Sequence, residues 1–234
     1  MNSIKKITVL LAEDHAIVRE GLCRLLELEG HFEIVGQAEN GREAVALAAA
    51  LQPEVILMDI GMPVLNGLEA TRQIVAANPH AKVLILSAHG DDEYIDRAAT
   101  VGAAGFLEKQ TSAEVFTAAI REVARGKSFF SPAIARRMSD RRNRSRDRQG
   151  LPKPGSLLLT SREMEVLQLV AEGNSNRETA TSLHISIKTV EKHRQHLMDK
   201  LNLHETAGLT RYAIAHGVIK NNVEVTIVGA DVAH

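Results

Sequence analysis

The chain of 234 residues is 44% hydrophobic and 24% charged, with a net charge of −1. This is enough apolar material to bury one large core or two smaller ones, and it excludes an intrinsically disordered chain. The single cysteine, Cys23, excludes an internal disulfide, and no apolar run is long enough to span a bilayer. Acidic residues appear too early in the N-terminal segment for it to be a signal peptide. We therefore expect a cytoplasmic, globular protein with no membrane partner.

Charge separates the chain into two halves. Residues 1–126 hold 11 basic and 18 acidic side chains, a net −7, whereas residues 127–234 hold 17 and 11, a net +6. Between them, residues 131–156 contain seven arginines and close with prolines and a glycine, which is typical of an extended linker. The sequence thus predicts an acidic domain and a basic domain that bind different partners.

Short apolar runs alternate with stretches of helical spacing in the acidic half. The alternation predicts a doubly wound α/β fold, in which a five-stranded parallel sheet is covered by helices on both faces. Ligands of such sheets bind beyond the carboxyl ends of the strands. The expected strands are 7–12, 33–36, 54–59, 82–88 and 104–109.

Polar residues follow these strands at the edge where a ligand is expected. Glu13 and Asp14 follow the first strand, Asp59 the third, Ser87 the fourth and Lys109 the fifth. Three carboxylates in one crevice repel one another unless a cation lies among them, and Mg²⁺ suits oxygen ligands of this kind. A lysine and a hydroxyl beside them suit a phosphate. Each residue alone has an ordinary explanation at the surface, but their coincidence at one edge favours a site.

These residues, together with Pro63, Gly67 and Ala88, resemble the receiver domain of bacterial two-component response regulators over residues 5–126. The resemblance implies a flavodoxin-like receiver fold in which Asp59 accepts a phosphoryl group from a cognate sensor histidine kinase. It further implies that Mg²⁺ is held by Glu13, Asp14, Asp59 and the backbone carbonyl of Gly61, and that the phosphoryl group is bound by Ser87 and Lys109. Phe106 matches the switch aromatic of these domains, although it is equally compatible with ordinary core.

The spacing of apolar residues in the basic half predicts a small all-α domain. Thr160 or Ser161 is placed to cap a helix that ends near Gly173, and a short helix then runs through Leu183. A turn leads into a third helix, 188–201, with a basic outer face. Helix, turn and basic helix is typical of a DNA-reading unit, although a charged amphipathic helix alone is more often a solvated face.

The second half resembles the LuxR-type helix-turn-helix domain over residues 157–220, and with a receiver it points to the NarL/FixJ class of response regulators. The resemblance implies groove-facing positions at Glu191, Lys192 and Gln195, and candidates for phosphate contact at Lys188, Thr189, Arg194 and Lys200.

Two positions depart from the LuxR-type pattern. Thr179 stands where an aliphatic residue is usual, and His184 stands where a glycine is usual. We expect a left-handed backbone at His184, which is an uncommon state for a residue other than glycine.

The sequence therefore predicts four segments: a receiver at 5–126, a linker at 127–156, a helix-turn-helix domain at 157–220 and a tail at 221–234 to which we assign no role. The expected function is that of a DNA-binding response regulator, not an enzyme, phosphorylated on Asp59 with Mg²⁺ and controlling transcription. Its expected partners are the kinase, double-stranded promoter DNA, a second copy of the chain when phosphorylated, and RNA polymerase.

Two other functions stay open from the sequence. The receiver fold also serves dimerisation or ligand binding in transcription factors that need no phosphorylation. An Asp-nucleophile phosphohydrolase also has a carboxylate after a strand, but it commonly has a second acid two positions on, where this chain has Gly61. For the resting state, we expect the receiver either to cover the third helix or to hold the chain as a monomer.

Overall fold

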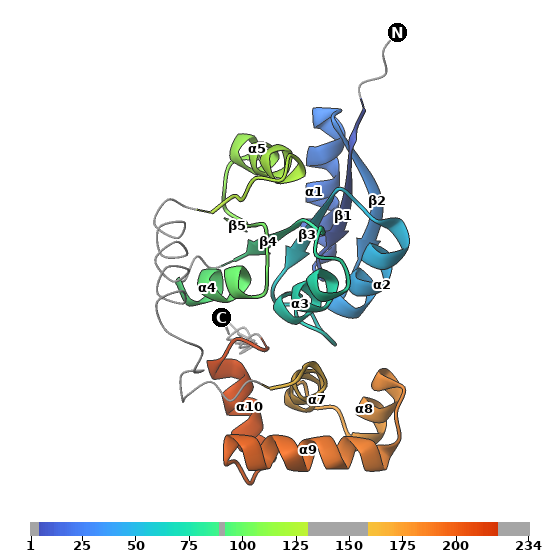
Figure 1. The fold of residues 1–234 in the computed structure, drawn as a ribbon, viewed down its shortest axis with the longest axis vertical. Coiled ribbons are helices and arrows are strands. Elements are labelled where there is room, and N and C mark those ends of the chain that lie inside the picture. The colour runs from blue at the N-terminus through green and yellow to red at the C-terminus, as the bar shows by residue number, and fades with distance from the viewer. Residues whose placement is uncertain (1–4, 89–91, 131–158, 220–234) are drawn as a thin grey trace, which may run out of the picture.

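The computed structural model describes residues 5–88, 92–130 and 159–219 (Figure 1). The predicted Arg-rich stretch at 131–156 and the predicted tail at 221–234 lie outside the described residues. Among the helices of the described part, none is long and apolar enough to cross a membrane.

The first domain is built on a five-stranded parallel sheet, as predicted, with strand order β2-β1-β3-β4-β5. The strand order reverses between β1 and β3, which places the expected ligand crevice at their carboxyl ends. β3 and β4 are buried at every position because helices cover both faces of the sheet. The strands are β1 (Ile7–Ala12), β2 (Phe32–Ala38), β3 (Val55–Asp59), β4 (Val83–Ser87) and β5 (Gly105–Glu108).

The helices form two layers around the sheet (Figure 1). One layer holds α1 (Ala16–Glu29) and α5 (Ala113–Ala124), whose buried side chains pack with one face of the sheet. The other layer packs on the opposite face of the sheet. It consists of α2 (Gly41–Leu51), α3 (Gly67–Ala77) and α4 (Asp92–Thr100).

A glycine at the start of α3 lets this helix approach the end of β3. A Cβ added at Gly67 would lie 1.9 Å from the carbonyl oxygen of Asp59, and the Gly67 N–H donates to the Ile60 carbonyl at 2.8 Å. No larger residue fits that space without moving the backbone. Gly67 therefore helps to fix the position of Asp59.

Residues 127–130, which the sequence assigned to the linker, lie against the receiver. Phe129 donates its N–H to the Ala104 carbonyl and accepts from the Phe106 N–H, both at 2.9 Å. Its ring and that of Phe130 pack against the two cores of the domain. Through these two half-buried rings and the backbone bonds of Phe129, residues 129–130 pack with the receiver.

The second domain is all-α, as predicted. It contains α7 (Ser161–Ala171), α8 (Asn176–Leu183), α9 (Ile187–Leu201) and α10 (Thr206–Ala215) around one apolar core. Thr160 is the N-cap of α7, and its side chain and that of Glu163 form a capping box. His184, which ends α8, has φ 52° and ψ 45°, so the left-handed conformation expected there is confirmed.

The two domains are in contact. α7 packs against α3 and the loop that precedes it, and the end of α10 reaches the receiver near α4 (Figure 1). α9 runs along the side of the second domain that faces away from the receiver (Figure 1).

Candidate functional site

Four potential ligand side chains meet at the carboxyl ends of β1 and β3. The ligand atoms of Glu13, Asp14, His15 and Asp59 all lie within 4.8 Å of one another. Glu13 is fully buried and Asp59 is 2% exposed, whereas the Asp14 side chain is 24% exposed. The parallel strands deliver the acids here because their carboxyl ends share one edge of the sheet. The structure thus brings together the three carboxylates that the sequence singled out.

Lys109 supplies positive charge to this cluster. Its Nζ lies 2.5 Å from Glu13 Oε2 and 2.9 Å from Asp59 Oδ1. Burial acts to lower the pKa of Lys109, but the nearby carboxylates of Asp59 and Glu13 outweigh it and raise the pKa above its usual value. Lys109 is therefore firmly protonated. The buried Ser87 is held beside it, because the Ser87 carbonyl accepts from the Lys109 N–H at 2.7 Å.

His15 belongs to the cluster, and the sequence analysis missed it. Its Nδ1 lies 2.9 Å from Asp14 Oδ1 and 3.1 Å from Glu13 Oε1. The only sequence signal was its position directly after Glu13 and Asp14. A surface histidine after a strand has no pattern that separates it from an ordinary loop residue.

The donor set suits a hard divalent cation. The ligand atoms of three carboxylates lie within reach of one ion, and Gly61 lines the cavity beside Asp59. Oxygen donors of this kind match the preference of Mg²⁺.

A cavity of about 560 Å³ opens above Asp59. Receiver residues on its wall include Asp59, Ser87 and Lys109, which the sequence singled out together. The opposite wall comes from the second domain, and no sequence pattern announced it. That wall consists of Ile214, Gly217, Val218 and Ile219.

Phe106 lies on β5 within the core. It is 6% exposed and packs in the cluster between the sheet and the α2, α3 and α4 layer. This placement is compatible with both interpretations made from the sequence, a switch aromatic and an ordinary core residue.

The predicted DNA-contact residues of α9 divide into two groups. Lys188, Glu191, Lys192 and Gln195 are exposed. The other three are engaged inside the domain: Thr189 bonds to the N-cap Ser186, Arg194 donates to Asn176 and Thr206, and Lys200 lies 2.7 Å from Glu163 Oε2.

A groove of about 640 Å³ runs between α8 and α9. Glu191 and Gln195 line it from α9, and Asn176 and Arg177 line it from the start of α8. The sequence analysis did not single out the two α8 residues, because neither belongs to the basic face of the third helix. The groove thus combines predicted and unpredicted positions.

An acidic crevice at the switch point of a five-stranded α/β sheet, joined to a small all-α domain, is the arrangement of the response regulator class. Comparison with known families agrees. Residues 9–121 match the response regulator receiver domain, and residues 157–213 match the bacterial regulatory proteins of the luxR family.

Curated relatives match over nearly the whole chain. The chain is 37% identical to the transcriptional regulatory protein DegU of Brevibacillus brevis, over 92% of this chain and 96% of that one. It is 39% identical to the response regulator VraR of Staphylococcus aureus, over 92% of this chain and 99% of VraR. The chain therefore belongs to the NarL/FixJ-class response regulators, the DNA-binding transcription regulators of two-component systems.

Solved structures share the fold. The receiver domain of the putative response regulator NarL from Mycobacterium tuberculosis is 33% identical and covers 53% of this chain and 99% of its own length, with a TM-score of 0.51. RcsB of Salmonella typhimurium is 23% identical, and the match covers 91% of this chain and 98% of RcsB with a TM-score of 0.58. At that identity, RcsB supports the two-domain fold alone.

Proposed function

We propose that Asp59 is the phosphoacceptor of this response regulator and that its phosphorylation controls transcription through DNA binding by α9. The observation that carries the proposal is the buried Asp59 carboxylate with the Lys109 ammonium 2.9 Å away, beside Glu13, Asp14 and Ser87. A carboxylate so placed can act as a nucleophile toward phosphorus while the lysine neutralises charge.

The chemistry is a phosphoryl transfer from a kinase phosphohistidine. An Asp59 carboxylate oxygen forms a bond to phosphorus, the phosphorus–nitrogen bond breaks, and its electron pair stays with the imidazole. Lys109 and the Ser87 hydroxyl donate to the phosphoryl oxygens. Glu13, Asp14, Asp59 and the Gly61 carbonyl would hold Mg²⁺, which when bound offsets the negative charge of the carboxylates and the phosphoryl group. Aspartyl phosphate is then the signal that the second domain reads.

DNA binding is proposed for the exposed face of α9. Lys192 can donate to guanine, Gln195 can pair with adenine, and Glu191 can accept from cytosine or orient Lys192, each good pair giving roughly 1–3 kcal/mol of discrimination. Lys188 is proposed to contact phosphate. Arg194 and Lys200 keep further N–H donors for phosphate beyond their bonds inside the domain.

Assembly on DNA is the last part of the proposal. Phosphorylation shifts the population from the resting form to a dimer. Two copies of α9 then reach half-sites about one helical turn apart. Promoter-bound dimers are proposed to act on transcription through RNA polymerase.

The test is covalent phosphorylation of the full chain by acetyl phosphate with and without Mg²⁺, followed by intact mass measurement. We expect one added phosphoryl group that requires Mg²⁺ in the wild type and in Asp199→Asn, and none in Asp59→Asn. If Asp59→Asn is phosphorylated like the wild type, Asp59 is not the acceptor. Repeated turnover on a phosphate ester would instead favour a phosphohydrolase, and DNA binding that is indifferent to phosphate would favour a phosphorylation-independent transcription factor.

A further inference from the structure

Ile187 is a large apolar side chain that the second domain leaves in contact with water. It is 46% exposed, and within residues 159–219 it is the one large hydrophobic residue in the exposed class. It does not belong to the apolar core that the described part of this domain forms. Single exposed apolar residues are common on protein surfaces, so this exposure alone indicates no function. The position of Ile187 on α9 gives the exposure its meaning.

Ile187 is the first residue of α9 and lines the groove between α8 and α9. Glu191 and Gln195, which line the same groove, follow it at intervals of four residues. Residues four apart on a helix are neighbours on its surface. Ile187 therefore begins the row that contains two of the proposed base-reading side chains.

The first turn of α9 is held in a fixed orientation. The Ser186 hydroxyl accepts from the Thr189 N–H at 3.1 Å and lies 2.8 Å from the Thr189 hydroxyl. Val190 is fully buried, so the helix cannot rotate about its axis without exposing an apolar side chain. The hydroxyls on either side of Ile187 are thus engaged in capping the helix, and the apolar side chain faces the groove between them.

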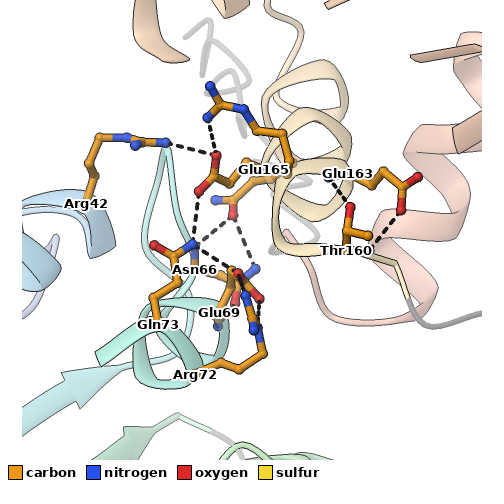
Figure 2. A network of polar contacts seen from close by, with 10 residues as sticks. Arg42, Asn66, Glu69, Arg72, Gln73, Thr160, Glu163 and Glu165 are labelled. Atoms are coloured by element: carbon orange, nitrogen blue, oxygen red, sulfur yellow. Dashed lines mark hydrogen bonds and ion pairs between the residues drawn. The ribbon is translucent and has the colours of Figure 1, made fainter. Parts of the chain in front are cut away.

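The receiver does not cover this side of α9. It contacts α7, where Glu165 accepts from Gln73 at 2.9 Å and lies 3.5 Å from Arg42 (Figure 2). It also contacts the end of α10, where the His216 carbonyl accepts from Arg97. The proposed base-reading side chains of α9 stay exposed beside these contacts. The expectation that the receiver covers this helix at rest is therefore wrong for this arrangement.

Basic side chains flank Ile187. Lys188 follows it in the chain, Lys192 lies further along α9, and Arg177 lines the groove from α8. Cations in these places suit the phosphates that border a groove of DNA. An apolar side chain between them suits an apolar group on a base edge, and the major groove presents one such group, the C5 methyl of thymine. The N-terminal residues of a recognition helix are those that contact base edges.

We propose that Ile187 is a specificity-determining residue that contacts the C5 methyl group of a thymine in the major groove. The proposal rests on the proposed DNA binding by α9. Because its side chain has no hydrogen-bonding group, Ile187 selects thymine by removing the methyl group from water. Burial of one methyl-sized group changes affinity about fourfold, which corresponds to about 0.8 kcal/mol.

Helical geometry places this thymine near the base that Glu191 reads. Four residues of an α-helix span about 6 Å along its axis. Successive base pairs are about 3.4 Å apart. With α9 lying along the groove, the two contacts therefore fall about two base pairs apart in the same half-site.

The test is a thymine-to-uracil scan of a selected binding site. The full chain, treated with acetyl phosphate and Mg²⁺, selects duplexes from a random-sequence pool. Each thymine of the selected site is then replaced in turn by deoxyuridine, which pairs with adenine in the same way but lacks the methyl group. Dissociation constants are measured for the wild type, Ile187→Ala, Ile187→Val and the matched control Lys188→Ala, which removes the adjacent side chain of the same turn.

For the wild type, we expect about fourfold weaker binding when one particular thymine of each half-site is replaced. This thymine should lie about two base pairs from the position whose base preference changes in Glu191→Ala. Ile187→Ala should bind the thymine and uracil duplexes equally at that position, and Ile187→Val should show a reduced effect of about twofold. Lys188→Ala should bind every duplex more weakly but keep the fourfold effect, because a phosphate contact is blind to sequence.

A fourfold effect that persists at every sensitive thymine in both Ile187 variants overturns the inference. A wild type that is indifferent to every uracil overturns it as well, and in both cases DNA binding by α9 stands. Loss of the methyl effect in Lys188→Ala would assign the effect to the helix start as a whole and would also overturn the role of Ile187. Failure of the phosphorylated chain to enrich any sequence overturns the proposed function and this inference together.

Discussion

The substitution Thr179→Val tests the packing of the DNA-binding domain at its most unusual position. Thr179 lies on α8, is fully buried, and its Oγ1 has no hydrogen-bond partner among the residues that the structure describes. An unsatisfied buried hydroxyl costs about 1–3 kcal/mol. Valine has nearly the same shape and a similar helix propensity, and its methyl group gains burial in place of the hydroxyl.

We therefore expect Thr179→Val to stabilise the domain by about 1–2 kcal/mol, or roughly 4–8 °C in Tm for each kcal/mol in a domain of this size. Differential scanning calorimetry of the full chain measures the shift. The chain has no tryptophan and two tyrosines, Tyr94 on α4 and Tyr212 on α10, so tyrosine fluorescence in a Tyr94→Phe background assigns the transition to the second domain.

The matched control is Thr181→Val on the same helix. Thr181 is exposed and its hydroxyl donates to the Arg177 carbonyl at 3.0 Å, so no stabilisation is expected. If Thr179→Val lowers the Tm, the Thr179 hydroxyl has a partner in solution and the reasoning fails. If both variants shift the Tm alike, the effect comes from the helix and not from the buried hydroxyl.

Three further substitutions follow from the same structure. His184→Gly should stabilise the DNA-binding domain by about 1 kcal/mol in urea unfolding, because glycine relieves the left-handed strain; an unchanged midpoint would contradict this. Gly67→Ala should destabilise the receiver by about 2–3 kcal/mol, whereas Gly21→Ala, with open space around it, should not destabilise it; equal effects would refute the steric argument. Burial acts to raise the pKa of the Glu163 carboxyl, but hydrogen bonds from Lys200 and from the capping box outweigh burial and lower that pKa. The stability that these interactions of the Glu163 carboxylate contribute is therefore present above pH 4.5 and is lost as pH falls through the lowered pKa. Lys200→Met should flatten the acid side of the stability profile, and a profile like that of the wild type would count against the pair.

The sheet and the acidic site could be predicted because local patterns encode them. Apolar runs mark the strands, and parallel strands necessarily bring Asp59 and Lys109 to one edge. The prediction of β2 was incomplete. The apolar run 33–36 covers only part of the strand Phe32–Ala38, because pairing with β1 continues the strand as far as Ala38. The strand propensities of the residues after position 36 give no reason to extend the predicted strand to Ala38.

The features that sequence reasoning missed depend on contacts between distant segments. Ile219 reaches the cavity above Asp59 only through the docking of two domains. Lys200 shows the basic periodicity of an outer face, yet it pairs with Glu163 on another helix. A periodic pattern gives the face on which a charge lies, but not the neighbour that meets it. Three-dimensional packing decides that question.

The most direct test of the central claim measures phosphorylation and DNA retardation on one sample. Full-length wild type and Asp59→Asn are treated with acetyl phosphate and Mg²⁺, and each is then assayed for covalent phosphate and for retardation of a cognate promoter fragment. The account predicts that the wild type gains one phosphoryl group and binds DNA more tightly, while Asp59→Asn gains neither. Equal retardation by both proteins, with and without the donor, would contradict it.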